Sequence, residues 1–273
     1  MDKAKNLFSL ESKVAVITGG AGILGSAIAR GFGEAGATVV ICDIKNAAER
    51  AEEIRDAGIT CDGFSTDILK REKTEEVRDA ILEKYKKVHV LVNAAGGNRP
   101  DATTSEEQPF FSLPVPAMEK VIALNLWGTV VPSQVFGKPL AKNEAGGSII
   151  NISSMNALRP LTRIPAYSAA KAAVSNFTQW LAVHCAQEYN KNLRVNAIAP
   201  GFFLTEQNRY LLLDREKQLT PRGEKIIEHT PMGHFGNPED LVGICVYLAS
   251  EASRFVTGTV IPIDGGFSAF SGV

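Results

Sequence analysis

The chain has 273 residues, of which 45% are hydrophobic and 22% charged, and its formal net charge is −1. This composition is typical of a globular protein with an ample core, and the length suits one large α/β domain. The charge excludes a basic field for nucleic acid and a polybasic patch for a membrane. Residues 1–13 lack the apolar stretch of a signal peptide, so we expect a cytoplasmic protein.

The four cysteines, Cys42, Cys61, Cys185 and Cys245, are widely scattered and fall in apolar stretches. We therefore expect them to be small buried side chains. The histidines show no metal-ligand spacing, so no metal site is expected.

Short β-branched runs alternate with longer amphipathic stretches along the chain. Several runs are apolar on both faces, as in a parallel sheet covered by helices on each side. The alternation predicts a doubly wound α/β fold, and without a linker or repeat we expect one domain over residues 1–273. The expected strands are residues 14–18, 38–43, 88–93, 148–153, 194–199 and 260–264, and the expected helices are 25–35, 47–57, 73–85, 117–136, 167–189 and 238–250.

Two long stretches, residues 97–116 and 202–237, are predicted to be irregular. Long loops in compact domains tend to be functional. Both follow the C-terminal ends of expected strands, where ligands of open α/β sheets bind. We expect them to be the substrate loops.

The run TGGAGILG at residues 18–25 lies directly between the first expected strand and a helix. Glycines let the backbone approach a pyrophosphate, and the helix N-terminus supplies unpaired N–H donors. Asp43 ends the second strand, where its carboxylate could accept hydrogen bonds from the adenosine ribose and repel the 2′-phosphate of NADP. A plain strand-end aspartate is the alternative, and Lys45 could offset part of that repulsion. The pattern favours NAD over NADP.

Tyr167 and Lys171 lie four positions apart, and Ser154 follows an expected strand. On a helix this spacing places the ammonium group beside the phenol, and nearby positive charge lowers a tyrosine pKa. A tyrosine so tuned can exchange a proton with a carbonyl or alcohol oxygen, to which Ser154 would hydrogen-bond. Taken alone, Tyr and Lys at this spacing are more often a solvated helix pair than a catalytic one, and it is the neighbouring motifs that favour the catalytic interpretation.

Together these motifs resemble the short-chain dehydrogenase/reductase family, from Lys13 to the DGG run at residues 264–266. The resemblance implies a single-domain Rossmann fold, a homotetramer in which helices 117–136 and 167–189 pair between subunits, and a catalytic tetrad of Asn125, Ser154, Tyr167 and Lys171. In it, Asn125 would keep a water relay connected to Lys171.

The resemblance also assigns the cofactor contacts. One departure is visible, because the usual TGxxxGxG spacing is TGxxGxxG here, with Ile23 where glycine is commonest. Besides Tyr167 and Lys171, the implied contacts are Gly19, Gly22, Ile23, Leu24, Gly25, Asp43, Asp67, Ile68, Asn93, Ala94, Ala95, Gly96, Pro200, Gly201 and Thr205.

A narrower resemblance lies in AGGNRP at 95–100, SSMNA at 153–157, PGFFLTEQNR at 200–209 and the C-terminal GGFSAFSGV. These strings are similar to the D-mannonate oxidoreductase, or fructuronate reductase, branch of the family, which interconverts D-fructuronate and D-mannonate. Amide and cationic side chains in these segments suit a sugar acid, and an arginine would meet its carboxylate. The candidates are Asn98, Arg99, Asn156, Arg159, Arg163, Gln207, Asn208, Arg209 and His234.

Three other interpretations stay open. The same scaffold could serve another polyol or keto-sugar acid, as in gluconate 5-dehydrogenases, or a 3-oxoacyl substrate, although the polar loops disfavour an acyl chain. A nucleotide-sensing protein would lack tetrad residues, and all four are present. A structural protein could use the helices 117–136 and 167–189 as an interface.

Overall fold

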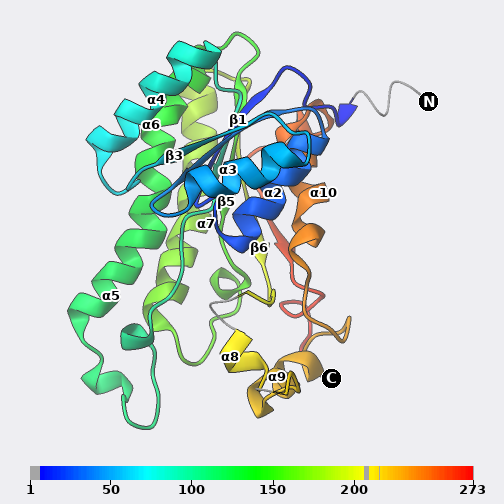
Figure 1. The fold of residues 1–273 in the computed structure, drawn as a ribbon. Coiled ribbons are helices and arrows are strands. Elements are labelled where there is room, and N and C mark those ends of the chain that lie inside the picture. The colour runs from blue at the N-terminus through cyan, green and yellow to red at the C-terminus, as the bar shows by residue number, and fades with distance from the viewer. Residues whose placement is uncertain (1–6, 206–208, 215, 273) are drawn as a thin grey trace.

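A seven-stranded parallel sheet forms the centre of the computed structural model, which describes residues 7–205, 209–214 and 216–272. The strand order is β3-β2-β1-β4-β5-β6-β7, with helices on both faces (Figure 1). This arrangement confirms the expected doubly wound α/β fold. The strands are β1 Val14–Thr18, β2 Thr38–Asp43, β3 Cys61–Ser65, β4 Val90–Asn93, β5 Gly147–Ile152, β6 Leu193–Pro200 and β7 Val260–Ile263.

The two faces of the sheet bury separate hydrophobic clusters because successive strand side chains point to opposite sides. Ala15 and Ile17 of β1 pack under α2 (Ile23–Glu34), α3 (Ala47–Asp56) and α10 (Val242–Ala249). Val14 and Val16 pack under α4 (Arg71–Tyr85), α6 (Gly128–Lys142) and α7 (Pro165–Glu188) on the other face. A sheet covered on both faces explains why its strands are apolar throughout.

Strand β3 was not expected from the sequence. Asp62 and Gly63 lie inside it, and both residue types are depleted in strands. It is an edge strand that pairs with β2, and it is only partly buried. Its side-chain pattern therefore carries little of the hydrophobic signal that marks the central strands.

The helix expected at 117–136 is three segments in the structure. Helix α5 (Val115–Ile122) passes into a π-helical turn, Ala123–Trp127, and then into α6. Helix α6 continues to Lys142 although Pro132 and Pro139 lie inside it. A change of hydrogen-bond register within a continuous helix leaves no clear mark in hydrophobic spacing, so the prediction of one regular helix was wrong.

The two stretches expected to be irregular also contain short helices. Residues 97–116 include η1 (Pro100–Ala102) and η2 (Phe110–Ser112), and residues 202–237 include α8 (Arg209–Leu212) and α9 (Pro221–Glu228). Helix α9 begins at a capping threonine, because Thr220 Oγ1 accepts the Gly223 N–H at 3.1 Å. Helices α8 and α9 lie together beyond β6 (Figure 1).

All four cysteines are free and buried, as expected. Among the described residues, no helix has the length and apolar character needed to cross a membrane.

Candidate active site

The carboxyl ends of the strands meet at one edge because all seven strands run parallel. Thr18, Asp43, Asn93 and Pro200 are the last residues of their strands. The glycine run, the segment after β4, the η4 turn (Met155–Ala157) and the segment after β6 therefore begin side by side. The sequence motifs come together at this edge.

Gly19 holds the glycine run against the segment after β4. Its φ is +66°, and a Cβ there would lie 2.6 Å from the Ala95 backbone. A Cβ on Gly25 would overlap the Gly19 carbonyl oxygen. The N-cap residue of α2 is Gly22, which has no side chain to bond the free N–H groups of the first helical turn. A pyrophosphate could therefore reach these N–H groups, in the turn that includes Ile23 and Leu24. This close-packed glycine cradle fits a dinucleotide.

Asp43 lies beside the same loop. Its carboxylate accepts the Ala21 N–H at 3.1 Å and the Lys45 N–H at 3.2 Å. These two bonds orient a partly exposed anion at the end of β2 and leave it further acceptor capacity.

Asp67 and Ile68 follow β3. Asp67 accepts the Leu69 N–H at 3.1 Å, which fixes the turn into α4. Ile68 is 6% exposed and lies against Gly128 at the start of α6.

Ser154 and Tyr167 bring their hydroxyl-bearing side chains close enough for Ser154 to lower the pKa of the Tyr167 hydroxyl. Ser154 caps η4 by accepting the Asn156 N–H at 3.3 Å. Tyr167 lies in the first turn of α7 and packs against the cluster of Ala102, Ala117, Val121 and Ala166. Burial raises the pKa of the Tyr167 hydroxyl, and the polar contact with Ser154 lowers it by a smaller amount. The expected net lowering of the Tyr167 pKa is therefore wrong for the structure described, because the desolvation of the hydroxyl dominates.

Lys171 is 4% exposed, one turn after Tyr167 on α7. Its Nζ donates to the Ile152 carbonyl at 2.7 Å and lies 5.6 Å from the centroid of the Tyr167 ring. Burial lowers the pKa of the Lys171 ammonium to about 8. The cation is thus held beneath the phenol by the end of β5.

Asn125 lies in the π-helical turn and is fully buried. Its Oδ1 accepts the Gly97 N–H at 3.1 Å, and its Nδ2 donates to the Gly97 carbonyl at 2.7 Å. A Cβ on Gly96 would lie 2.7 Å from Asn125 Oδ1 and 3.2 Å from Lys171 Nζ. Asn125 and Lys171 therefore flank Gly96, and with Ser154 and Tyr167 they form one cluster. π-helical turns are frequent at functional sites.

Asn93 has a structural role that the sequence did not reveal. Its Nδ2 donates to Asn151 Oδ1 at 2.8 Å and to Ser133 Oγ at 2.9 Å. Asn151 in turn donates to Thr178 Oγ1 at 2.8 Å. This buried chain ties β4 and β5 to α6 and α7 behind the cluster.

The segment after β6 is anchored to the end of β7. The Gly201 N–H donates to the Ile263 carbonyl at 2.9 Å, and a Cβ on Gly201 would lie 2.6 Å from Asp264. Further on, the Thr205 carbonyl accepts the Arg209 N–H at 2.9 Å, at the start of α8. Gln207 and Asn208, which were expected near the substrate, lie outside the described residues.

Some of the side chains expected to bind substrate are already bonded to other protein groups, and others are not. Arg99 forms a bidentate ion pair with Asp101 at 2.9 and 3.0 Å. Arg159 Nε donates to the Ser268 carbonyl at 3.2 Å, and Asn98 Nδ2 donates to Thr103 Oγ1 at 2.7 Å.

Asn156 differs from these, because it is 4% exposed and its Oδ1 has no hydrogen-bond partner among the described residues. Arg163 and Arg209 are exposed, and His234 bonds only the neighbouring Phe235 carbonyl within the described part of the chain.

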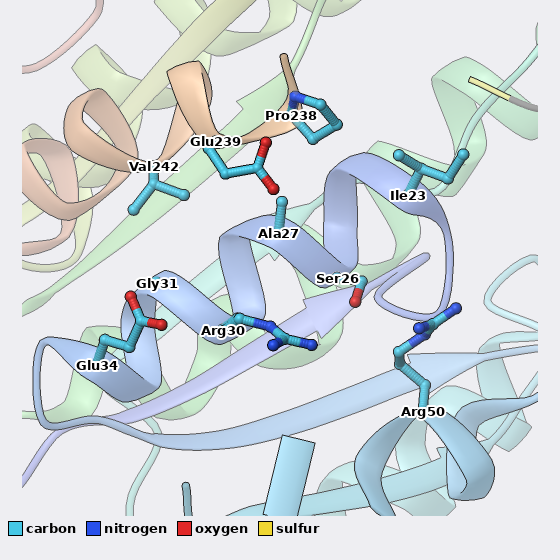
Figure 2. Close-up of a pocket in the computed structure, with 10 residues that line it drawn as sticks. All are labelled: Ile23, Ser26, Ala27, Arg30, Gly31, Glu34, Arg50, Pro238, Glu239 and Val242. Atoms are coloured by element: carbon cyan, nitrogen blue, oxygen red, sulfur yellow. The ribbon is translucent and has the colours of Figure 1, made fainter. Parts of the chain in front are cut away.

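Two cavities lie outside this cluster. One, of about 330 Å³, lies on the outer side of α2, with Pro238 and Glu239 of η5 (Pro238–Leu241) on one side and Arg50 of α3 on the other (Figure 2). The other, of about 260 Å³, is lined by Phe202, Phe203 and Gly265 among others. Neither is lined by Ser154 or Tyr167, so the reacting groups belong to the open strand edge.

A family model described as enoyl-(acyl carrier protein) reductase matches residues 19–268. Its match spans the glycine run and the Ser154, Tyr167 and Lys171 positions. The chain belongs to the short-chain dehydrogenase/reductase family.

Known relatives match the chain over nearly its whole length. It is 47% identical to the uncharacterized oxidoreductase UxuB of Bacillus subtilis strain 168, covering 97% of this chain and 98% of the relative. It is 34% identical to 2-dehydro-3-deoxy-D-gluconate 5-dehydrogenase of Dickeya dadantii, covering 97% and 98%.

Among solved structures, the chain resembles a candidate D-mannonate oxidoreductase from Haemophilus influenza with bound NAD (TM-score 0.90, 44% identity, covering 99% of this chain and 100% of that chain). It also resembles a gluconate 5-dehydrogenase from Burkholderia cenocepacia with NADP and tartrate (TM-score 0.87, 30% identity, 98% and 99%). The protein is therefore a pyridine-nucleotide-dependent oxidoreductase that acts on a CH–OH group.

Proposed function

We propose that the protein interconverts D-fructuronate and D-mannonate and uses NAD as its cofactor. The observation that carries this proposal is the full-length likeness to the NAD-bound candidate D-mannonate oxidoreductase, at 44% identity and a TM-score of 0.90. We place the whole chain in one domain and, as part of the same proposal, in a cytoplasmic homotetramer.

Each residue of the cluster has a proposed role. The bound nicotinamide supplies and accepts the hydride. In the reductive direction the Tyr167 hydroxyl gives its proton to the substrate oxygen that becomes the alcohol, while the Ser154 hydroxyl donates a hydrogen bond to that oxygen. Lys171 places a cation below the phenol and favours its ionised form after the proton has left. Asn125 holds Gly97 in position through the two side-chain bonds to its backbone.

Asn156 is the proposed contact to a substrate hydroxyl. Its buried Oδ1 is an acceptor without a partner among the described residues, and its backbone N–H bonds Ser154. A buried acceptor gains from a donor that reaches it, and a sugar acid is rich in such donors. Asn98, Arg99, Arg159 and Arg209 lie farther out in the proposed substrate region.

The cofactor preference depends on Asp43. Its carboxylate is oriented by the Ala21 and Lys45 N–H groups and could accept the ribose hydroxyls, whereas the 2′-phosphate of NADP would meet a negative charge. We expect kcat/KM to be higher with NADH than with NADPH.

The variant Asp43→Asn keeps the shape of the side chain and one oxygen that can accept a hydrogen bond from the glycine run, but it removes the negative charge. It should narrow the NADH preference, whereas Asp43→Ala should weaken both cofactors because the loop loses its anchor. Equal use of the two cofactors by the wild-type enzyme would overturn the NAD assignment.

A panel of ketones tests the substrate. Purified protein with NADH is assayed with D-fructuronate, 5-keto-D-gluconate and an acetoacetyl thioester, and D-fructuronate is expected to give the highest kcat/KM. A higher value for 5-keto-D-gluconate would favour the second candidate, a gluconate 5-dehydrogenase-like activity, which the Burkholderia cenocepacia structure supports. A preference for the thioester would refute both.

A further inference from the structure

Arg163 and Arg222 come from distant parts of the chain. Arg163 lies two residues before Pro165, the first residue of α7, and Arg222 is the second residue of α9. The sequence singled out Arg163, whereas Arg222 was missed because it lies in none of the strings that carry the family resemblance.

The C-terminal segment 264–270 brings the two surrounding segments together. On one side, Arg159 Nε donates to the Ser268 carbonyl at 3.2 Å. On the other, the His229 ring, just after α9, lies 6.3 Å from the Phe270 ring, and the Met232 N–H donates to the Gly265 carbonyl at 3.1 Å. The entry to α7 and the end of α9 therefore pack on the same stretch of chain.

The packing on this shared segment brings Arg222 within reach of the charge of Arg163. Burial lowers the pKa of Arg222, which is half-buried, and the nearby positive charge of Arg163 lowers it further. Within the part of the chain that the structure describes, neither side chain forms an ion pair, since the ion pairs found there join other residues.

Arg194 shows how the fold compensates a buried guanidinium when the role is structural. Burial lowers its pKa too, but its guanidinium donates to the carbonyls of Leu248, Ser250 and Val256. Over the described residues, the Arg222 side chain has no such set of acceptors. Two neighbouring cations without protein acceptors among the described residues suit an anionic ligand, because a planar guanidinium pairs well with a carboxylate.

The position relative to Tyr167 suits the far end of a sugar acid. Arg163 precedes Tyr167 by four residues, and its carbonyl accepts the Thr104 N–H at 2.9 Å, which fastens the segment 97–116 to the entry of α7. In D-fructuronate the carboxylate is at the opposite end of the carbon chain from the ring-open ketone carbon next to the terminal alcohol. A carboxylate site must therefore be displaced from the reacting hydroxyl.

We propose that Arg163 and Arg222 together bind the substrate carboxylate and thereby hold α9 over the bound sugar acid. This inference rests on the proposed function and adds the carboxylate partners to it. Neutralising the two cations with one anion removes their repulsion in the bound state only. Binding energy from this remote group would help to position the reacting carbon beneath Tyr167.

The test measures binding without turnover. D-mannonate, and in a second series D-gluconate, is titrated into the protein–NADH complex by calorimetry, alongside D-mannonamide, which carries an uncharged amide in place of the carboxylate. Arg163→Met and Arg222→Met should each raise the Kd for D-mannonate by about 10-fold to 100-fold, the range of a charged hydrogen bond. The Kd for the amide should change by less than about threefold, which is below 1 kcal/mol.

Further variants separate carboxylate binding by Arg163 and Arg222, here called the clamp, from a general structural effect of the substitutions. Arg222→Lys keeps the charge without the planar fork and should recover part of the D-mannonate affinity. Arg254→Met, an exposed arginine after η6 (Glu251–Ser253), should bind D-mannonate as the wild type does. All variants are first checked for unchanged NADH affinity and melting temperature, and a variant that fails this check is replaced by its Gln counterpart.

The outcomes distinguish the two proposals. If the wild-type complex binds D-mannonate or D-gluconate and the Met variants bind the same anion unchanged, the clamp is refuted while a sugar-acid substrate stands. Equal weakening of acid and amide would also refute it. If the wild-type complex binds neither anion, the clamp and the sugar-acid proposal both fail, and the oxidoreductase assignment is unaffected.

Discussion

The Tyr167 hydroxyl is the group on which the proposed proton transfer depends. In Tyr167→Phe the ring can keep its packing against the cluster of Ala102, Ala117, Val121 and Ala166, but the hydroxyl and its contact with Ser154 are lost. We expect kcat to fall by about 10² to 10⁴-fold, the usual contribution of general acid catalysis. Steady-state kinetics with a calorimetric NADH Kd checks this, and a variant that keeps more than half of the wild-type kcat would remove Tyr167 from the mechanism.

The buried Lys171 ammonium should make stability depend on pH. Burial lowers its pKa to about 8 in the folded protein, from its ordinary value of 10.5. Between these values the unfolded chain binds more protons, so the free energy of unfolding rises with pH through this window. The sign follows from the charged form being the one that burial penalises.

Lys171→Met isolates this effect. The free energy of unfolding of the wild type minus that of the variant should be flat below about pH 8 and should increase by up to about 3 kcal/mol toward pH 10.5, at about 1.4 kcal/mol for each pH unit. Urea unfolding at pH 7, 8, 9 and 10 measures it. A difference that is constant, or that decreases with pH, would contradict the burial of this ammonium group.

Sequence reasoning reached the residues whose signal is local. Ser154, Tyr167 and Lys171 follow from a strand end and a helical spacing, and the structure joins them in one cluster. Arg222 has no local signal, because its significance comes from Arg163, which is brought near only by the packing of α9 on the C-terminal segment. The direction of the Tyr167 pKa shift depends on burial, which spacing alone does not reveal.

At the level of elements, the effect of a Gly→Ala substitution in the glycine run should depend on which glycine is replaced. Gly19→Ala would place a Cβ 2.6 Å from the Ala95 backbone at a φ of +66°. We expect the variant to lose about 1 to 3 kcal/mol of stability, the usual cost of such a strained backbone, and to bind NADH more weakly.

Gly22→Ala is the matched control. Gly22 has a φ of −71°, and its Cβ would lie 3.3 Å from the Gly19 carbonyl oxygen. Without cofactor it should stay within about 1 kcal/mol of the wild type, the range of an N-cap change. Thermal unfolding of the two variants without cofactor compares them, and equal losses would show that the close approach at Gly19 is not the cause.

The central strands were predictable because their burial on both faces produces continuous apolar runs. Edge strand β3 was not predicted from the sequence, because Asp62 and Gly63 interrupt its hydrophobic pattern and only one neighbouring strand stabilises it. The π-helical turn was not predicted for a different reason. It changes which backbone groups pair and leaves the side-chain composition almost unaltered.

The whole molecule exposes apolar side chains along α7, which bears on the proposed homotetramer. Trp180 is 55% exposed and Val183 is 58% exposed, and the Trp180 ring stacks on His184 at 4.7 Å. We expect Val183→Lys to shift the protein to a smaller species, because a buried lysine at a subunit contact has no partner there.

Sedimentation velocity measures the species, with Ala80→Lys on the exposed side of α4 as the control. A wild-type protein that is monomeric at micromolar concentration, or an unchanged assembly in Val183→Lys, would exclude α7 from the interface.

The buried amides of β4 and β5 have a consequence for folding specificity. Both strands are apolar enough to slide past one another, because Val, Leu and Ile would remain covered in several registers. Asn93 and Asn151 are partners in the observed register, and their side chains are bonded at 2.8 Å. A one-residue slip would separate them and leave buried amides unpaired, at about 1 to 3 kcal/mol each. The pair thus selects one strand register among several of similar apolar burial. Ser154, which follows β5, is therefore placed at one defined position relative to the end of β4.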